Sequence, residues 1–342
     1  MVSPLGWLYG KIINQRNASY DRGTLKSHYL GAPTISVGNI TVGGTGKTPL
    51  VVHIAEILAE QGEKVCIISR GYKRENEKEQ VLVSDGKGVL ADVRKTGDEP
   101  FVLASKLTGK AVVIANPDRV EAAKWALDNF EVTVFLLDDG FQHRKAKRDL
   151  DIVVIDATDP FGNLEPLPSG ILREPIENLA RGDLFVITRG NLVESVSEVV
   201  SEIRKHNQSS PIILSENVTA KTTRLSDFIS GTACDDEYIR TKCLAFCALG
   251  NPENFFNQLK KSGFEVSSTR AFSDHHSYLQ RDVEKLEKIA LQNSAEAFLT
   301  TAKDAVKLRE LEFNIPCFVV ESRLAFDNEK KLREKIYAVF ES

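Results

Sequence analysis

The feature that most constrains this chain is a glycine-rich loop near its N-terminus. Residues 34–37 form a short apolar run typical of a buried strand, and the loop GNITVGGTGKT follows at residues 38–48. A helical stripe of apolar residues then begins at Leu50 and ends near Gly62. Strand, glycine loop, Gly-Lys-Thr and helix in this order predict a phosphate-binding P-loop. An ordinary glycine-rich turn is the alternative, but such a turn does not require Lys-Thr at this place.

Each part of the loop has an expected role in binding ATP and Mg²⁺. Backbone N–H groups and the helix N-terminus would contact phosphate oxygens, Lys47 would reach the outer phosphates, and Thr48 would offer its hydroxyl to Mg²⁺. Position 41 holds threonine where the full motif has glycine. Partitioning-type ATPases carry a lysine where this chain has Val42, which disfavours that class. The expected phosphate-binding residues are Gly43, Gly44, Thr45, Gly46, Lys47 and Thr48.

Size and charge narrow the class of protein further. The chain has 342 residues, of which 42% are hydrophobic and 27% charged, as in a globular protein of about two domains. Its net charge of −4 argues against a nucleic-acid partner. The five cysteines are odd in number, and Cys66 and Cys317 lie in apolar runs, so free thiols in a reducing compartment are expected. We see no signal peptide and no apolar run of the roughly 18 residues that a membrane-spanning helix needs.

Residues 1–30 precede the first strand and have a character of their own. Leu5, Leu8, Tyr9 and Ile12 share one helical face, and the segment carries four basic residues and one acidic residue. A basic amphipathic helix with Trp and Tyr suits the surface of an anionic membrane. A helix packed on the protein's own surface explains the same pattern equally well, so the pattern alone leaves both interpretations open.

Apolar runs alternate with helical patterns from residue 31 to residue 216. This alternation predicts an α/β fold, namely a P-loop NTPase-like, mostly parallel sheet with helices on both faces. A second, smaller α/β domain is expected over residues 217–342. Ligands of parallel sheets gather at the carboxyl ends of the strands, so functional residues are expected there. The runs that predict buried strands after the glycine loop are 65–68, 111–115, 132–137, 152–155, 184–187 and 212–214.

Acidic residues end one of these strands. Asp138 and Asp139 follow an apolar run, as in a Walker B strand whose carboxylates hold Mg²⁺. Further along, a proline-rich loop carries Arg173 and Glu174 next to each other. Arg173 could clamp a phosphate of the nucleotide and Glu174 could add a metal ligand, whereas a simple surface ion pair is the alternative. The expected metal ligands are Thr48, Asp138, Asp139 and Glu174.

Two arginines follow other predicted strands, and candidate acid–base residues lie at a helix start and in a loop. Arg70 and Arg119 each come shortly after a predicted strand, where a guanidinium can reach a phosphate of the substrate, although a surface turn also explains Arg70. Asp98 lies in GDEP at a predicted helix start, where it is either an N-cap or a general base. His275 and His276 are adjacent and follow Asp274 in a loop flanked by aromatic residues, so a functional role and a structural role both remain open for them.

A series of ordered motifs extends over nearly the whole chain, namely WLYG, VGNITVGGTGKTP, SRGY, GDEP, LDDGFQH, LPSGILREP, LGNPENFF, FSDHHSY and TTAKDAVKL. Taken together, these motifs resemble those of one enzyme family, the tetraacyldisaccharide 4′-kinases, which are the lipid A 4′-kinases of Gram-negative bacteria. The family often has alanine where Ser169 stands and glutamate where Ala302 stands, and neither position touches the expected chemistry.

The resemblance implies a kinase that transfers the γ-phosphate of ATP to the 4′-hydroxyl of a tetraacyldisaccharide 1-phosphate, an acylated glucosamine disaccharide phosphate lipid, in lipid A biosynthesis. It also implies a site between two α/β domains, a peripheral location on the cytoplasmic face of the bacterial inner membrane, and contact of residues 1–30 with that anionic membrane surface. The alternatives are a P-loop ATPase that drives a partner, or a soluble sugar or nucleotide kinase. The first leaves the histidine loop unexplained, and the second has no need of a basic aromatic N-terminus.

A sugar hydroxyl is a poor nucleophile at neutral pH, so a side chain must take its proton as the bond to phosphorus forms. We expect Asp98 to be the proton acceptor and His275 to orient it, with His276 as the alternative partner. The expected catalytic residues are therefore Asp98, His275 and Lys47. Arg70 and Arg119 are expected to bind the lipid substrate and Arg173 the nucleotide.

Overall fold

The structure is a computed structural model that describes residues 4–72, 74–230, 239–274 and 276–341. The chain divides into two compact units, one made of Met1–Glu216 with Ala325–Ser342 and the other of Asn217–Leu324. The chain passes between the units along two long strands, β8 (Ile212–Arg224) and β12 (Cys317–Phe326).

The C-terminal segment differs from the expected domain over residues 217–342, because the chain returns to the first unit after β12. Asp327 Oδ1 accepts a hydrogen bond from Leu214 N at 2.9 Å, and the Phe326 ring lies 4.8 Å from the His53 ring. Helix α11 (Glu329–Tyr337) follows and buries Leu332 and Ile336. These contacts make the last helix part of the unit that carries the glycine loop.

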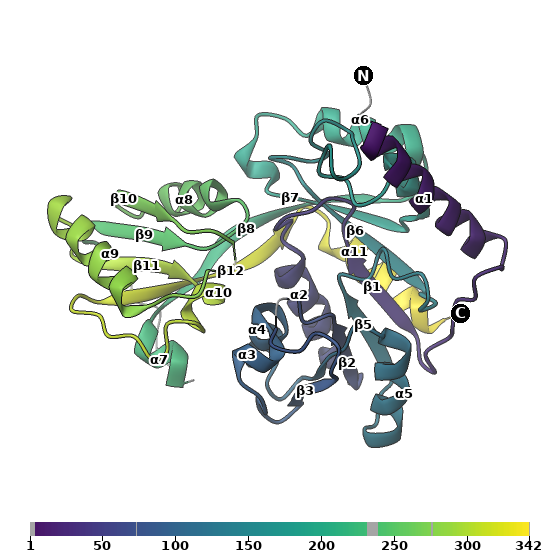
Figure 1. The fold of residues 1–342 in the computed structure, drawn as a ribbon, viewed down its shortest axis with the longest axis horizontal. Helices are drawn as coiled ribbons and strands as arrows, with labels where there is room; N and C mark the ends of the chain where they lie inside the picture. Colours follow the sequence, from purple (N-terminus) through teal and green to yellow (C-terminus); the bar gives the residue numbers. More distant parts are fainter. Residues whose placement is uncertain (1–3, 73, 231–238, 275, 342) are drawn as a thin grey trace. The chain divides into compact units, whose positions relative to one another are not determined.

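The first unit is built on a mostly parallel sheet, which confirms the predicted α/β fold (Figure 1). The strand order is β8-β7-β6-β1-β5-β2-β4-β3, and every neighbouring pair is parallel except the antiparallel edge pair β3 and β4. The glycine loop therefore leaves the centre of the sheet. The strands are β1 (Thr34–Gly38), β2 (Val65–Ser69), β3 (Val81–Asp85), β4 (Ala111–Ala115), β5 (Val134–Asp138), β6 (Leu150–Asp156) and β7 (Leu184–Thr188).

Helices cover both faces of this sheet. The alanine-rich face of α5 packs with Cys66, Ile68 and Phe135 in one buried cluster. Side chains alternate along a strand, so Ile67 and Leu136 point to the opposite face, and α2 packs against β1, β2 and β5 (Figure 1). The helices of this unit, besides α11, are α1 (Pro4–Asp21), α2 (Lys47–Glu60), α3 (Val93–Thr96), α4 (Asp98–Lys106), α5 (Arg119–Asn129) and α6 (Ser197–His206), with short 3₁₀ turns at Ile176–Arg181, Gly190–Leu192 and Ala338–Phe340.

Helix α1 lies at the periphery of the first unit (Figure 1). Its buried residues are Gly6, Gly10 and Asn17, whereas four of its large apolar side chains are exposed. Tyr9, which was expected to share a helical face with Leu5, Leu8 and Ile12, is half-buried, whereas those three residues are exposed. Within the part of the chain that the structure describes, the helices do not combine the length and apolar character needed to cross a bilayer. The exposed apolar residues of α1 are Leu5, Trp7, Leu8 and Ile12.

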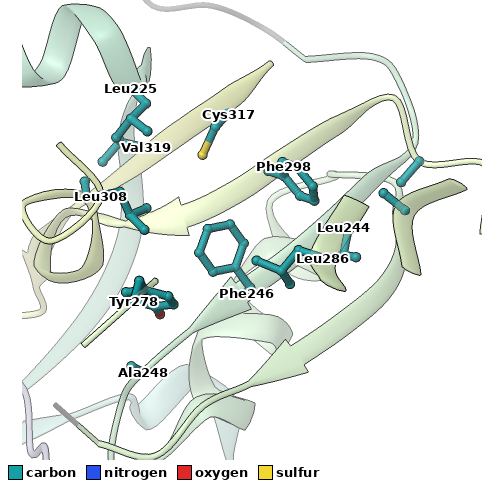
Figure 2. Packing of buried hydrophobic residues seen from close by; sticks show 13 residues of the cluster. Leu225, Leu244, Phe246, Ala248, Tyr278, Leu286, Phe298, Leu308, Cys317 and Val319 are labelled. Carbon is teal, nitrogen blue, oxygen red and sulfur yellow. The ribbon is translucent and has the colours of Figure 1, made fainter. Parts of the chain in front are cut away.

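The second unit has a smaller parallel sheet and its own core. Its strands β9 (Cys243–Cys247), β10 (Val266–Ala271), β11 (Ala297–Thr301) and β12 lie in the order β10-β9-β11-β12. The ring of Phe246 contacts those of Phe298 and Tyr278 edge-on, with centroids 5.9 and 5.8 Å away (Figure 2). The helices of this unit are α7 (Leu225–Ser230), α8 (Pro252–Lys261), α9 (Gln280–Gln292) and α10 (Ala302–Ala305).

Candidate functional site

The glycine loop leaves β1 and leads directly into α2. Gly43 and Gly46 have φ angles of 108° and 85°, which L-side chains rarely adopt, so glycine is needed at both positions. Apart from the neighbouring residues in sequence, no atom of the described residues lies within 4 Å of where a Cβ would stand on Gly43 or Gly44, so the loop faces open space there. Lys47 is the first residue of the helix. The unpaired backbone N–H groups at a helix N-terminus carry the positive end of the helix dipole, and they bind anions.

The ends of β6 and β7 hold the loop from outside. Thr188 Oγ1 donates to the carbonyl oxygen of Thr45, and Arg189 Nη1 donates to that of Gly44, each at 2.9 Å. Arg189 also forms an ion pair with Asp156, which is buried at the end of β6. In a trans peptide the N–H points opposite to the C=O, so these bonds turn the N–H groups of Thr45 and Gly46 away from β6 and β7. None of Asp156, Thr188 and Arg189 was predicted from the sequence, although each lies at a strand end.

We expect Arg189→Ala to raise the KM for ATP by about ten-fold or more, because it removes a charged hydrogen bond and leaves the Asp156 carboxylate buried without its ion pair. Steady-state kinetics at varied ATP would measure this change. The exposed Arg281 of the second unit provides a matched control, and Arg281→Ala should leave the KM for ATP unchanged. An unaltered KM in Arg189→Ala would contradict a role for the strand ends in shaping the loop.

The side chain of Lys47 is buried and points back to the end of β1. Its Nζ donates to Asn39 Oδ1 at 3.0 Å and lies 3.3 Å from Asp139 Oδ1. Asn39 is held in turn by its own hydrogen bond from Nδ2 to Thr41 O at 2.8 Å. The predicted phosphate-contacting lysine and one acid of the predicted pair therefore meet at the ends of two neighbouring parallel strands, β1 and β5.

The two acids after β5 have opposite electrostatic environments. Asp138 is buried and accepts a hydrogen bond from Ser69 Oγ at 2.8 Å. Burial, with the charges of Glu99 and Asp139, raises the pKa of Asp138 to about 7. Burial also acts to raise the pKa of Asp139, but Lys47 and Arg173 overcome it and hold the pKa below its usual range. Arg173 Nη1 lies 2.9 and 2.7 Å from the two carboxylate oxygens of Asp139.

Glu99 is an acid near the loop that was not predicted from the sequence. It lies in the first turn of α4, and its charge acts on Asp138. The signal in the sequence is the pair of adjacent acids in GDEP, of which Asp98 is the predicted functional residue. No group of three or more His, Cys, Asp or Glu side chains among the described residues is close enough to enclose a metal ion. The charge of Glu99 helps to raise the pKa of Asp138, so a cation bound beside these two acids would be favoured.

The residues predicted to take part in acid–base catalysis have different local environments. Asp98 is the first residue of α4 and is half-buried, and the N-cap is Gly97, so the N-cap alternative for Asp98 is wrong. His275 lies outside the described residues. His276 Nε2 is 3.1 Å from Asp282 Oδ2, and its ring stacks on Phe272 with a centroid distance of 4.7 Å. His276 therefore has partners within its own unit.

The three predicted phosphate-binding arginines have three different environments. Arg70 is exposed after β2, and its guanidinium lies 5.7 Å from the centroid of the Tyr72 ring. Arg119 is only 4% exposed and donates to Pro117 O at 3.0 Å. Burial lowers the pKa of Arg119, and the nearby carboxylates of Asp139 and Asp138 oppose that shift. Arg119 is therefore buried where the charges of Asp138 and Asp139 act on it, and its contact with the lipid substrate stays a prediction.

Glu174 is predicted from the sequence to be a metal ligand, and in the structure protein donors bind its buried carboxylate. Arg181 donates to both oxygens at 3.0 and 3.2 Å, Asn17 Nδ2 to Oε2 at 3.0 Å, and Gln142 Nε2 to Oε1 at 2.8 Å. Glu174 is 1% exposed, so these bonds compensate for its lost hydration. Arg173 and Glu174 are neighbours in sequence but point to different partners, and only Arg173 points to the acids after β5.

Known proteins are similar to this chain over its whole length. Residues 1–341 match the model of the LpxK family, described as tetraacyldisaccharide-1-P 4′-kinase. A relative from Halothermothrix orenii named tetraacyldisaccharide 4′-kinase is 36% identical, with 98% of this chain and 91% of that relative covered. A relative of the same name from Syntrophotalea carbinolica is 37% identical, with 97% and 90% covered. A crystal structure of LpxK from Aquifex aeolicus in complex with ATP is similar over 98% of both chains, with 32% identity and a TM-score of 0.76.

Proposed function

This chain belongs to the tetraacyldisaccharide-1-P 4′-kinase family, and from that premise we propose how its own residues carry out the reaction. The protein is a lipid A 4′-kinase, a phosphotransferase that uses ATP. The observation that carries the residue assignment is the meeting of Lys47, Asp139 and Arg173 beside the glycine loop, at the carboxyl ends of β1 and β5.

We propose that the glycine loop binds the β- and γ-phosphates of ATP through its backbone N–H groups, and that it acts as a P-loop. Lys47 would exchange its contact with Asp139 for the outer phosphates, and Arg173 would bind the γ-phosphate from the opposite side. Both cations lie within hydrogen-bonding or ion-pair distance of a single carboxylate, so they already converge on one negative group. Cations that converge in this way stabilise the charge of a transferring phosphoryl group.

The acids near the loop fit a divalent cation. Asp138 has a pKa raised to about 7 by burial and by the neighbouring Glu99 and Asp139, and a cation would relieve that repulsion. We propose that Asp138, Glu99 and the Thr48 hydroxyl hold Mg²⁺ together with phosphate oxygens, since Mg²⁺ in kinases commonly takes one or two carboxylates plus substrate phosphates. When bound, Mg²⁺ supplies charge neutralisation at the β- and γ-phosphates. Asp139 and Glu174, the other predicted ligands, are occupied by Lys47, Arg173 and Arg181.

The acceptor is the 4′-hydroxyl of a tetraacyldisaccharide 1-phosphate. In the proposed step the hydroxyl oxygen forms a bond to the γ-phosphorus, the bond from that phosphorus to the β–γ bridging oxygen breaks, and ADP leaves. Asp98 takes the hydroxyl proton. Arg70 is exposed at the end of β2, and we propose that it binds the 1-phosphate of the lipid.

We propose that the outer face of α1 binds an anionic membrane, which would place the enzyme peripherally at the cytoplasmic face of the bacterial inner membrane. Leu5, Trp7, Leu8 and Ile12 are each at least half exposed on this face. Lys11 Nζ lies 4.8 Å from the centroid of the Trp7 ring, so a cation accompanies the apolar residues. Exposed apolar residues next to a basic residue are typical of a helix that lies in a membrane interface.

The double substitution Trp7→Glu with Leu8→Glu is expected to weaken sedimentation with anionic vesicles by at least about ten-fold, because it removes apolar area and adds like charge to the lipid. The KM for lipid in vesicles should rise, while the KM for ATP should not change. Leu291→Glu is the matched control, since Leu291 is 83% exposed on α9 of the second unit. Equal sedimentation of the α1 variant and the unaltered chain would place the membrane contact elsewhere.

A transfer assay tests the proposed function directly. The full chain would be incubated with γ-labelled ATP and tetraacyldisaccharide 1-phosphate in detergent micelles, and label is expected in the lipid only when both substrates are present. Release of phosphate without the lipid acceptor would instead favour an ATPase. Equal transfer to a deacylated, water-soluble disaccharide 1-phosphate would favour a soluble sugar kinase.

A further inference from the structure

Helix α1 packs directly on the proline-rich loop that carries Arg173 and Glu174. A Cβ added at Gly6 would lie 3.0 Å from Ser169 Oγ and 3.1 Å from Pro166 O. A Cβ added at Gly10, one helical turn later, would lie 3.2 Å from the Pro175 ring. Two glycines on one face thus let the helix backbone approach the loop closely, while the apolar side chains on the other face remain exposed.

The contact continues to the backbone of Arg173. Tyr9 on α1 donates from its hydroxyl to the carbonyl oxygen of Arg173 at 2.9 Å. The N–H of Arg173 donates to Ile40 O at 2.8 Å, within the first residues of the glycine loop. Its guanidinium binds the Asp139 carboxylate, as described above. Residue 173 is therefore held at its N–H, its carbonyl oxygen and its side chain, and α1 supplies the second of these contacts.

A second connection runs through the buried carboxylate of Glu174. Asn17 on α1 is 4% exposed, and its Nδ2 donates to Glu174 Oε2 at 3.0 Å. Gln142 donates to the other oxygen of Glu174 and also to Asn39 O, each at 2.8 Å. Asn39 is the residue whose side chain receives the Lys47 ammonium. The amide of Asn17 is therefore linked by hydrogen bonds, through Glu174 and Gln142, to the residue that holds Lys47.

We propose that α1 is a structural part of the phosphoryl-transfer site, with Tyr9 and Asn17 as positioning residues that fix Arg173 and Glu174. This inference rests on the transfer reaction proposed above. It separates two roles within one helix, since the inner residues orient the site and the outer residues face the lipid. A deletion of the whole helix would remove both roles at once, so single side-chain changes are needed to tell them apart.

The first experiment measures kcat of the full chain with the lipid acceptor dispersed in detergent micelles. Tyr9→Phe removes one hydroxyl, and Asn17→Ala removes one buried amide, so each is expected to lower kcat about three- to ten-fold. Sedimentation with anionic vesicles should not change in either variant. Gln15→Ala is the matched control, because Gln15 is exposed on the same helix and should leave kcat unchanged. Wild-type kcat in both Tyr9→Phe and Asn17→Ala would overturn the proposal.

The second experiment asks whether Tyr9 acts through Arg173. In an Arg173→Ala background, Tyr9→Phe should cause little further loss of kcat, because the side chain that Tyr9 positions is already absent. A loss by the same factor in both backgrounds would show that Tyr9 acts elsewhere and would overturn the proposal. These results are distinct from failure of the proposed function itself, in which the unaltered chain would transfer no phosphate to the lipid.

Discussion

Lys47→Ala is expected to lower kcat for phosphate transfer by at least about a hundred-fold, because phosphoryl transfer depends almost wholly on positioning and charge stabilisation. Lys47 is the first residue of α2 and already lies 3.3 Å from the Asp139 carboxylate, so its ammonium is placed to meet an anion. The loss should fall on kcat more than on the KM for ATP, since the backbone N–H groups of the loop remain. Steady-state kinetics at saturating lipid would measure it.

The control for this substitution is a measurement of the unfolding temperature of the variant, which shows whether it is folded. Removal of the ammonium leaves Asp139 with Arg173 as its partner, so the carboxylate keeps a counter-charge and the variant should unfold at a temperature close to that of the unaltered chain. Lys47→Arg keeps the charge but changes its shape, and it should recover only part of the rate. A folded Lys47→Ala protein with near-normal kcat would remove Lys47 from the proposed mechanism.

The glycine loop could be predicted from sequence because its residues are contiguous. The conformation of residues 43–48 depends on local chemistry, namely glycines with positive φ followed by a helix start. The structure accordingly ends β1 at Gly38 and begins α2 at Lys47. The acid after β5 was predictable for a similar reason, since an apolar run that ends in Asp138 specifies both the strand and the edge at which it ends.

Side-chain partners that come from distant segments could not be predicted. Glu174 is adjacent to Arg173 in sequence, yet its partner Asn17 lies 157 residues away. A pattern of residue types does not state which of two adjacent side chains faces the acids. The burial of Tyr9 and Arg119 could not be predicted for the same reason, because the burial of a side chain depends on tertiary packing.

The residues at which the second unit begins and ends also depend on long-range contacts. From the sequence alone, residues 325–342 are predicted to belong to the same domain as the residues before them. The segment after β12 instead bonds to Leu214 through Asp327, and this contact joins positions separated by the whole second unit. The edge strand β3 also escaped prediction, because it pairs antiparallel with β4 in a sheet whose other neighbours in the first unit are parallel.

Asp98→Ala is expected to lower kcat by about 10²- to 10⁴-fold, the usual contribution of a general base. Asp98 opens α4 beside Glu99, whose charge acts on Asp138, so the start of this helix lies close to the proposed cation ligands. The substitution should leave ATP binding close to normal, because the proposed base acts on the acceptor hydroxyl. Equilibrium binding of ATP, measured together with kcat, would separate the two effects. Asp98→Asn keeps the size of the side chain and removes its basicity, so it should be as slow as Asp98→Ala.

The partner of Asp98 is testable through the same variants. His275 is the partner predicted from sequence, and His275→Ala should also depress kcat. Residues that act as a unit have non-additive effects, so the double variant should lose little more than the slower single variant. Fully additive losses would mean independent roles for Asp98 and His275. A normal rate in His275→Ala beside a slow His276→Ala would move the role to His276, whose ring already has Asp282 as a partner 3.1 Å away. In that case Asp282→Asn should slow the reaction as well, because the carboxylate that orients the ring would be lost.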